Sequence, residues 1–151
     1  MSSNATTPAV QTRLVTTQAD LTSAYAIRLQ VFVVEQGVPA EIELDDLDAA
    51  AEQVLAVVDG VPAGTGRLVV DGDTGILGRL AVLQEARGTG LGQTLVETIE
   101  QRAAQLGLAV VELHAQTQAR GFYERLGYAA HGAEYLEAGI MHVNMRKPLP
   151  S

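Results

Sequence analysis

The stretch Arg87-Gly88-Thr89-Gly90-Leu91-Gly92 decides how the rest of this sequence is interpreted. It follows an apolar, strand-like run at 80–83 and precedes a segment whose apolar residues recur at helical spacing: Leu91, Leu95, Ile99, Ala103 and Leu106. The first backbone amides of a helix have no partner within the helix, and glycine lets an anion approach them closely. We therefore expect this stretch to bind a phosphate-bearing molecule, with Arg87 adding a positive charge.

Two common phosphate-binding motifs do not fit this stretch. A P-loop needs Gly-Lys followed by Ser or Thr, whereas the three residues after Gly90 are Leu-Gly-Gln. A dinucleotide fingerprint needs a third glycine where Gln93 stands, although Glu112 would supply the acidic residue expected about twenty positions further on. The pattern that remains is R/Q-x-x-G-x-G/A.

Three β-type runs, at 53–58, 63–70 and 75–82, precede the glycine loop. Asp59-Gly60 separates the first two runs and Asp71-Gly72-Asp73 the second two, and both are turn sequences of tight antiparallel hairpins. They predict a three-stranded antiparallel meander ahead of the loop.

The segments after the glycine loop alternate between the two kinds of structure. The helix that follows the loop is stopped by Gly107. We then expect, in order, a strand at 108–115, a helix at 118–126, and strands at 128–130 and 140–146. A meander followed by a strand-helix-strand half predicts an α/β fold with a mixed sheet (α+β in layout), not a doubly wound parallel sheet.

The N-terminal segments are predicted from composition and periodicity. Residues 1–11 are expected to be a disordered leader, and residues 12–149 a single domain. A strand at 13–17 leads to a helix capped by Asp20, whose stripe is Leu21, Ala24/Tyr25, Arg28/Leu29 and Phe32. The acidic segment 35–48, broken by Gly37 and Pro39, is expected to be an exposed loop or short helix.

Composition excludes several function classes. The 151 residues contain no cysteine, so a thiolate nucleophile, a disulfide framework and a cysteine-ligated zinc site are excluded. The three histidines have no metal-ligand spacing, so we expect no metal. The net charge of -8 disfavours nucleic acid and anionic lipid and favours a cationic substrate such as an amine. With no apolar run of ~18 residues and no targeting pattern, a cytoplasmic protein is expected, away from membranes.

The loop pattern resembles that of the GNAT acetyltransferases, in which this loop binds the pyrophosphate of acetyl-CoA. The run Leu80-Ala81-Val82 is similar to the strand that pairs with the pantetheine arm in that family, and 121–128 (GFYERLGY) resembles its late helix with an F-Y-x-x-x-G-F/Y ending. The resemblance implies a GNAT acyl-CoA N-acyltransferase fold with acetyl-CoA as co-substrate. It implies these cofactor-binding residues: Leu80, Ala81, Val82, Arg87, Gly88, Thr89, Gly90, Leu91, Gly92, Gln93 and Gln116.

A narrower resemblance is to the ElaA branch of the GNAT proteins. It is carried by the blocks 28–36 (RLQVFVVEQ), Glu43 with 45–48, 78–79, 115–116 and 139–142. The departures are three: Ala40 stands where an aromatic residue is expected, Gln53 where a histidine is expected, and Met141 where a proline is expected. These departures affect which acceptor substrate is expected, and they do not change the assignment of the cofactor-binding residues.

The chemistry expected of such a site is direct attack of an amine on the thioester in a ternary complex, since no cysteine can carry an acyl group. The resemblance implies that Tyr123 protonates the leaving thiolate; the alternative is an ordinary packing tyrosine. Glu35 is the first candidate for the general base and His142 the second, with Glu112 and His114 also open. The oxyanion donor is expected to be a backbone N–H near Val82.

The expected acceptor is a small-molecule amine or a peptide amine, and a homodimer remains open. In GNAT proteins the acceptor binds where the acidic residues 41–48 lie. Two other functions stay open. The R-x-x-V-F pattern at 28–32 is also similar to that of acyl-homoserine-lactone synthases, but those enzymes do not need a pyrophosphate loop such as 87–92. The other alternative is a non-catalytic acyl-CoA-binding module, which Tyr123 and the candidate carboxylates disfavour.

Overall fold

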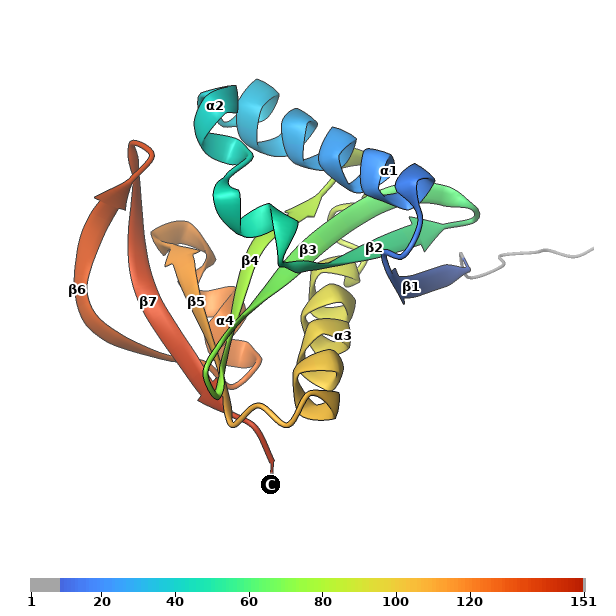
Figure 1. Cartoon of the computed structure of the whole chain (residues 1–151). Coiled ribbons are helices and arrows are strands. Elements are labelled where there is room, and N and C mark those ends of the chain that lie inside the picture. Colours follow the sequence, from blue (N-terminus) through green and yellow to red (C-terminus); the bar gives the residue numbers. More distant parts are fainter. Residues whose placement is uncertain (1–8, 151) are drawn as a thin grey trace, which may run out of the picture.

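A computed structural model of the protein describes residues 9–150, which form one seven-stranded sheet in the order β1-β2-β3-β4-β5-β7-β6 (Figure 1). The strands are β1 (Val10–Leu14), β2 (Glu52–Val58), β3 (Val61–Asp71), β4 (Thr74–Val82), β5 (Val110–Gln116), β6 (Ala129–Glu137) and β7 (Ile140–Pro148). Strands β1 to β4 are antiparallel, β4 and β5 are parallel, and β5, β7 and β6 are antiparallel. The predicted meander and the mixed-sheet α/β fold are confirmed.

Helices connect and cover these strands. They are α1 (Gln18–Arg28), a π-helical segment η1 (Leu29–Glu35), α2 (Ala40–Glu43), α3 (Leu91–Gln105) and α4 (Arg120–Arg125), with short 3-10 turns η2 (Asp46–Ala49), η3 (Gln84–Ala86) and η4 (Thr117–Ala119). Helix α1 packs on β2, β3 and β4, and α3 packs on the opposite face of the same strands (Figure 1). The core between α3 and the sheet includes the fully buried Leu95 and Ile99. Truncating a side chain such as Leu95 to alanine would cost about 2–5 kcal/mol.

The N-terminal elements differ from the sequence-based expectation. Residues 1–8 of the expected leader lie outside the described residues, while Val10 and Gln11 already belong to β1. Strand β1 therefore begins three residues earlier than predicted and ends at Leu14, because Thr17 instead caps α1 by accepting a hydrogen bond from the amide of Asp20. The pairing of β1 with β2, from Val10 with Val58 onward, sets these limits and is not visible in the sequence of β1 alone.

The buried stripe of α1 is also displaced from the predicted one. Ala24, Ile27, Arg28 and Val31 are buried, whereas Leu29 is 49% exposed. The helix widens into the π-helical η1 after Arg28, so the 3.6-residue period used for the prediction does not continue through Phe32. π-Helical segments are often found at functional sites.

Candidate active site

The sheet opens between its two parallel strands. The register between β4 and β5 ends at Leu77 with Leu113, although β4 continues to Val82 and β5 to Gln116. Strand β4 is irregular at this point, since its pairing with β3 shifts opposite Gly66, and Arg79 has a left-handed φ of 53°. A bulge bends the strand that carries it, and the ends of β4 and β5 diverge (Figure 1). Along its far half, β4 thus offers backbone groups that β5 does not pair.

The N-terminus of α3 follows the end of β4 after the short turn η3 and the glycine loop. Gly88 and Gly90 have φ values of 79° and 82°, and a Cβ atom on either would meet no atom within 4 Å. No side chain caps the helix, and its first turn contains no acidic residue. The first turn therefore keeps the free amides and the positive end of the helix dipole, which suit an anion.

The other predicted loop residues have more varied surroundings. The side chain of Leu91 is buried in the core, so only its backbone faces outward. A Cβ atom on Gly92 would lie 3.3 Å from Phe122, which means that this glycine lets α3 and α4 approach each other. Thr89 donates a hydrogen bond to the carbonyl of Ala86, and Gln93 donates one to Glu97 at 3.2 Å.

Arg87 and Glu35 lie together over the opening. Arg87 Nη2 is 2.5 Å from Glu35 Oε1, and Arg87 Nε donates to the carbonyl of Val82 at 2.9 Å. The next residue, Gln36, accepts a hydrogen bond from Gln116 of β5 at 2.8 Å. The end of η1 thus spans from the β4–α3 loop to β5, and it joins two predicted cofactor residues to a predicted base.

The side chains of the β4 run turn to both sides of the sheet. Leu80 and Val82 pack against the core under α3, and Ala81 is buried against the core under α1. None of the three offers a polar side chain, so any contact with a ligand in the opening would go through their backbone.

Tyr123 lies on α4, one residue after Phe122, which lies beside Gly92 in the first turn of α3. It is 8% exposed and packs edge-on against Phe122 and Tyr128, with ring centroids 4.9 and 5.9 Å away. Burial raises the pKa of Tyr123 above its ordinary value, so the phenol keeps its proton at neutral pH. Burial also raises the pKa of Tyr128, whose hydroxyl donates a hydrogen bond to Glu100 at 2.7 Å.

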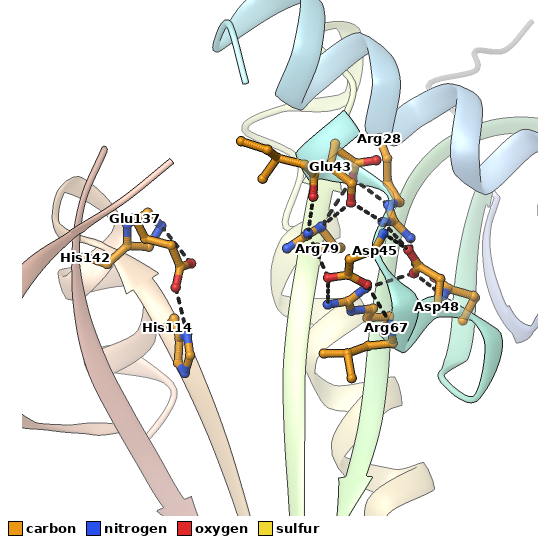
Figure 2. Close-up of polar contacts among 12 residues, drawn as sticks. Arg28, Glu43, Asp45, Asp48, Arg67, Arg79, His114, Glu137 and His142 are labelled. Carbon is orange, nitrogen blue, oxygen red and sulfur yellow. Dashed lines mark hydrogen bonds and ion pairs between the residues drawn. The ribbon is translucent and has the colours of Figure 1, made fainter. Parts of the chain in front are cut away.

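His142 lies on the face of β7 that points away from α3 and α4, where it faces Glu137 (Figure 2). Its Nδ1 is 2.7 Å from the carbonyl of Ile140, and its Nε2 is 3.8 Å from Glu137 Oε2. His114, the first residue of β5 beyond the last pair with β4, has Nδ1 3.3 Å from Glu137 Oε1. Tyr135 stacks on the His142 ring, with the centroids 6.1 Å apart. Two of the candidate bases thus share one carboxylate.

Most of the acidic segment 35–48 is exposed and it contains the short helix α2, as expected, but Glu43 is buried and Asp45 and Asp48 are half-buried and paired. Three of its carboxylates meet three arginines that are distant in the sequence (Figure 2). The closest ion pairs are Arg28–Glu43, Arg28–Asp48 and Arg67–Asp45, each at 2.7 Å, followed by Arg67–Asp48, Arg79–Asp45 and Arg79–Glu43. The formal charges of these six side chains cancel. Glu43, Asp45 and Asp48 therefore do not supply free negative charge to a cationic acceptor.

The arginines also fix the protonation of these acids. Burial alone would raise the pKa of Asp48, but hydrogen bonds from Arg28, from the Asp45 amide and from Arg67 hold it well below its usual range. The hydrogen bonds from Arg67 likewise lower the pKa of Asp45. Both groups are carboxylates at neutral pH, which keeps the ionic cluster intact.

Glu112 lies on the same face of the sheet as His114 and is 3.6 Å from the ring of His131. Between residues 9 and 150, no group of three or more acidic or histidine side chains is arranged to hold a metal ion. The helices in that range include none long and apolar enough to cross a membrane.

An apolar pocket of about 400 Å³ adjoins the loop that leads to α3. It is lined by Val10, Val58, Val61, Pro62, Ala63, Leu83, Glu85, Ala86 and Thr89. Such walls do not suit a polyanion, so the pyrophosphate assignment stays with the amides of the glycine loop.

Comparisons with known proteins agree with this geometry. The family described as "Acetyltransferase (GNAT) domain" matches residues 17–149. The uncharacterized N-acetyltransferase YjcF of Bacillus subtilis is 38% identical over 86% of this chain and 94% of its own. A crystal structure of an acyl-CoA N-acyltransferase from Pseudomonas aeruginosa superposes with a TM-score of 0.81 at 32% identity, covering 93% of this chain and 99% of that one.

The crystal structure of Escherichia coli ElaA superposes with a TM-score of 0.82 and covers 92% of this chain and 99% of that one. Its identity to this chain is 23%, so this likeness concerns the fold. The resemblance to GNAT proteins, with ElaA among the structural neighbours, is confirmed.

Proposed function

The chain belongs to the GNAT acetyltransferase family, and we propose that it transfers an acetyl group from acetyl-CoA directly to an amine in a ternary complex. The observation that carries this proposal is the opening between β4 and β5, which ends at the uncapped N-terminus of α3. A free strand edge and a free helix end are the two features that a molecule with amide groups and a pyrophosphate needs.

The residues present fit acetyl-CoA. The space at Gly88 and Gly90 is open, and the amides of the first turn of α3 would hold the pyrophosphate. The backbone of Leu80 to Val82 would pair with the pantetheine arm as an additional strand. When bound, acetyl-CoA supplies an acetyl thioester.

Tyr123 is proposed to give its proton to the departing thiolate. The raised pKa keeps the phenol protonated, and contact between Phe122 and Gly92 places α4 beside the loop that would hold the cofactor. Its hydroxyl is free of the kind of carboxylate partner that Tyr128 has in Glu100. These properties suit a general acid.

For the general base, the geometry favours His142 over Glu35. Glu35 is engaged by the guanidinium of Arg87, whereas Nε2 of His142 faces only the carboxylate of Glu137, at 3.8 Å. Because Nδ1 of His142 faces a carbonyl oxygen, it carries the proton, and Nε2 of the neutral ring has a free lone pair. Glu35 remains the alternative if Arg87 leaves it when the cofactor binds.

A thiol-release assay with acetyl-CoA and a panel of primary amines tests the proposed function. Amine-dependent release of CoA, with the acetylated amine identified by mass spectrometry, is the expected result. Binding of acetyl-CoA without turnover on any amine would indicate an acyl-CoA-binding module. Turnover that requires S-adenosylmethionine would instead support a synthase of the acyl-homoserine-lactone type.

A further inference from the structure

We propose that Glu137 is the residue that recognises the acceptor, and that it selects a cationic primary amine and holds it against His142. The acyl-transfer part of this inference rests on the proposed function. The binding part can be tested without turnover.

The first step of the argument is the hydrogen-bonding character of His142. Its Nδ1 lies 2.7 Å from the Ile140 carbonyl, which accepts only, so Nδ1 must donate. In the neutral ring Nε2 is then an acceptor, and it points at another acceptor, Glu137 Oε2, 3.8 Å away. That distance is too long for a direct hydrogen bond. A hydrogen-bond donor placed between these two acceptors could donate to both.

An ammonium group is such a donor. It has three N–H bonds and a positive charge, so it can donate to the carboxylate of Glu137 and to Nε2 of His142 together. The other carboxylate oxygen, Oε1, is already turned to His114 at 3.3 Å, which orients the side chain. The ring of Tyr135, stacked on His142, supplies apolar surface beside the site for the carbon that carries the amine.

Charge supports the same choice of ligand. The three acids of the ionic cluster are neutralised by arginines, whereas the partners of Glu137 are two histidines. Other charged side chains that β5, β6 and β7 present on this face are Glu112, His131 and Arg146. Arg146 is four residues from His142 along β7, roughly 13 Å at the rise of a strand, and does not neutralise Glu137.

The position of Glu137 in the sheet also supports a bound amine. His114 is the residue at which β5 parts from β4, and Glu137 contacts His114. A nitrogen held between Glu137 and His142 would therefore lie at the opening. The core under α3 contains Tyr123 together with Val143 and Met145 of β7, so such a nitrogen would lie on the opposite face of the sheet from Tyr123. Base and acid would approach the reacting group from opposite sides of the sheet.

The protons then balance. The bound ammonium passes one proton to Nε2 of His142, and the freed lone pair attacks the thioester carbon. The nitrogen loses a second proton to solvent as the C–N bond forms and the C–S bond breaks, and the thiolate takes one proton from Tyr123, which regains a proton from solvent. His142 then gives its proton to solvent, so that one proton is released net per turnover, and Glu137 stabilises the imidazolium while it exists.

Binding is tested first, with butylamine as the cationic probe and 1-butanol as its neutral counterpart. The ring signals of His114 and His142 are followed by NMR during titration at neutral pH. Butylamine is expected to shift both saturably, and E137Q to weaken this binding about 10- to 100-fold, the range for a lost hydrogen bond to a charged group. Glu134→Gln removes an exposed carboxylate from the same strand and should bind as the wild type does. Equal binding to E137Q, equal shifts with 1-butanol, or no shift of His142 would overturn the proposal.

Kinetics provide the second readout. E137Q should raise KM for the amine at least tenfold and leave KM for acetyl-CoA unchanged, and E137D, which keeps the charge on a shorter side chain, should recover part of the loss. A merely structural residue would alter both constants or neither. If the wild type acetylates amines and E137Q does so with an unchanged KM for the amine, this inference is wrong and the proposed function stands. If no amine is acetylated but butylamine shifts the His142 signals as described, the proposed function is wrong and the binding part of this inference stands.

Discussion

The guanidinium of Arg87 pairs with the carboxylate of Glu35 across the opening of the sheet, at 2.5 Å. The same guanidinium donates to the carbonyl of Val82, a backbone group of the strand that is proposed to hold the pantetheine arm. Arg87 thus occupies two positions that a bound cofactor would compete for. A pyrophosphate that recruits Arg87 must break its ion pair, and Glu35 is then released.

Removing this competition should tighten cofactor binding. Glu35→Gln keeps the shape of the side chain but loses the charge, so Arg87 becomes available to the pyrophosphate. Partly exposed ion pairs contribute about 0.2–1 kcal/mol, so the Kd for CoA measured by calorimetry should fall by up to about fivefold. Glu41→Gln, at an exposed position in α2, makes the same change in net charge and controls for general electrostatics. An equal gain in both variants, or none in either, would show that the ion pair does not compete.

Substitution of Gly90 should abolish cofactor binding. Valine there would fill the open space before the amides of α3 and would be strained by the left-handed φ of 82°. Gly107→Val is a matched control at the other end of α3, since Gly107 has a φ of 77° and also has open space around it. Both variants should lose similar stability in thermal unfolding, while only Gly90→Val should lose CoA binding by calorimetry. A folded Gly90→Val protein with the wild-type Kd would place the pyrophosphate elsewhere.

Tyr123→Phe should separate chemistry from packing. The ring contacts with Phe122 and Tyr128 are kept and the acid is lost, so kcat should fall by about 10²–10⁴ with little change in the Kd for CoA. The effect should shrink as the pH of the assay rises past about 8.5, where a thiolate leaves without a proton. Tyr128→Phe loses the bond to Glu100 and should instead cost stability with a near-normal kcat. An unchanged kcat for Tyr123→Phe across the pH series would remove it from the mechanism.

The ionic cluster should make stability depend on pH in the acidic range. The pKa values of Asp45 and Asp48 are lowered in the folded protein, so their contribution is present above about pH 5 and is lost as the pH falls toward the folded values. Asp48→Asn leaves Arg28 with one carboxylate fewer and should cost about 3–5 kcal/mol at pH 7, measured by urea unfolding. It should also flatten the decline in stability as the pH falls from about 5 toward 2. Asp46→Asn, at the exposed neighbouring position, should leave both stability and slope nearly as in the wild type.

Much of the fold could be predicted because its determinants are local. Asp59 and Gly60 both adopt left-handed φ values, 50° and 82°, which is why this dipeptide indicates a tight hairpin. The sequence predicts a strand at 128–130, whereas β6 extends from Ala129 to Glu137. Its turn, Ala138-Gly139, has two left-handed residues, and because alanine rarely adopts that conformation the dipeptide does not indicate a hairpin.

The parts of the site that could not be predicted depend on contacts between distant segments. Arg28 is 15 residues from Glu43 and 20 from Asp48, and no sequence spacing indicates that these charges are buried together. Glu137 was missed because a single exposed glutamate has no motif. Its neighbours, His114 and His142, come from two other strands that are joined only by the register of β5 with β7 and of β6 with β7.

The parting of β4 from β5 at Leu77 gives this sheet an edge inside it as well as at its two margins. An unpaired edge is a template on which another chain can add a strand, and proteins commonly guard such edges with charged or polar side chains. Glu35 and Gln36 stand over the inner edge through their contacts with Arg87 and Gln116. The residues that border the proposed cofactor channel thus also shield it from self-association, and the protein without its ligand should aggregate more readily once that shield is removed.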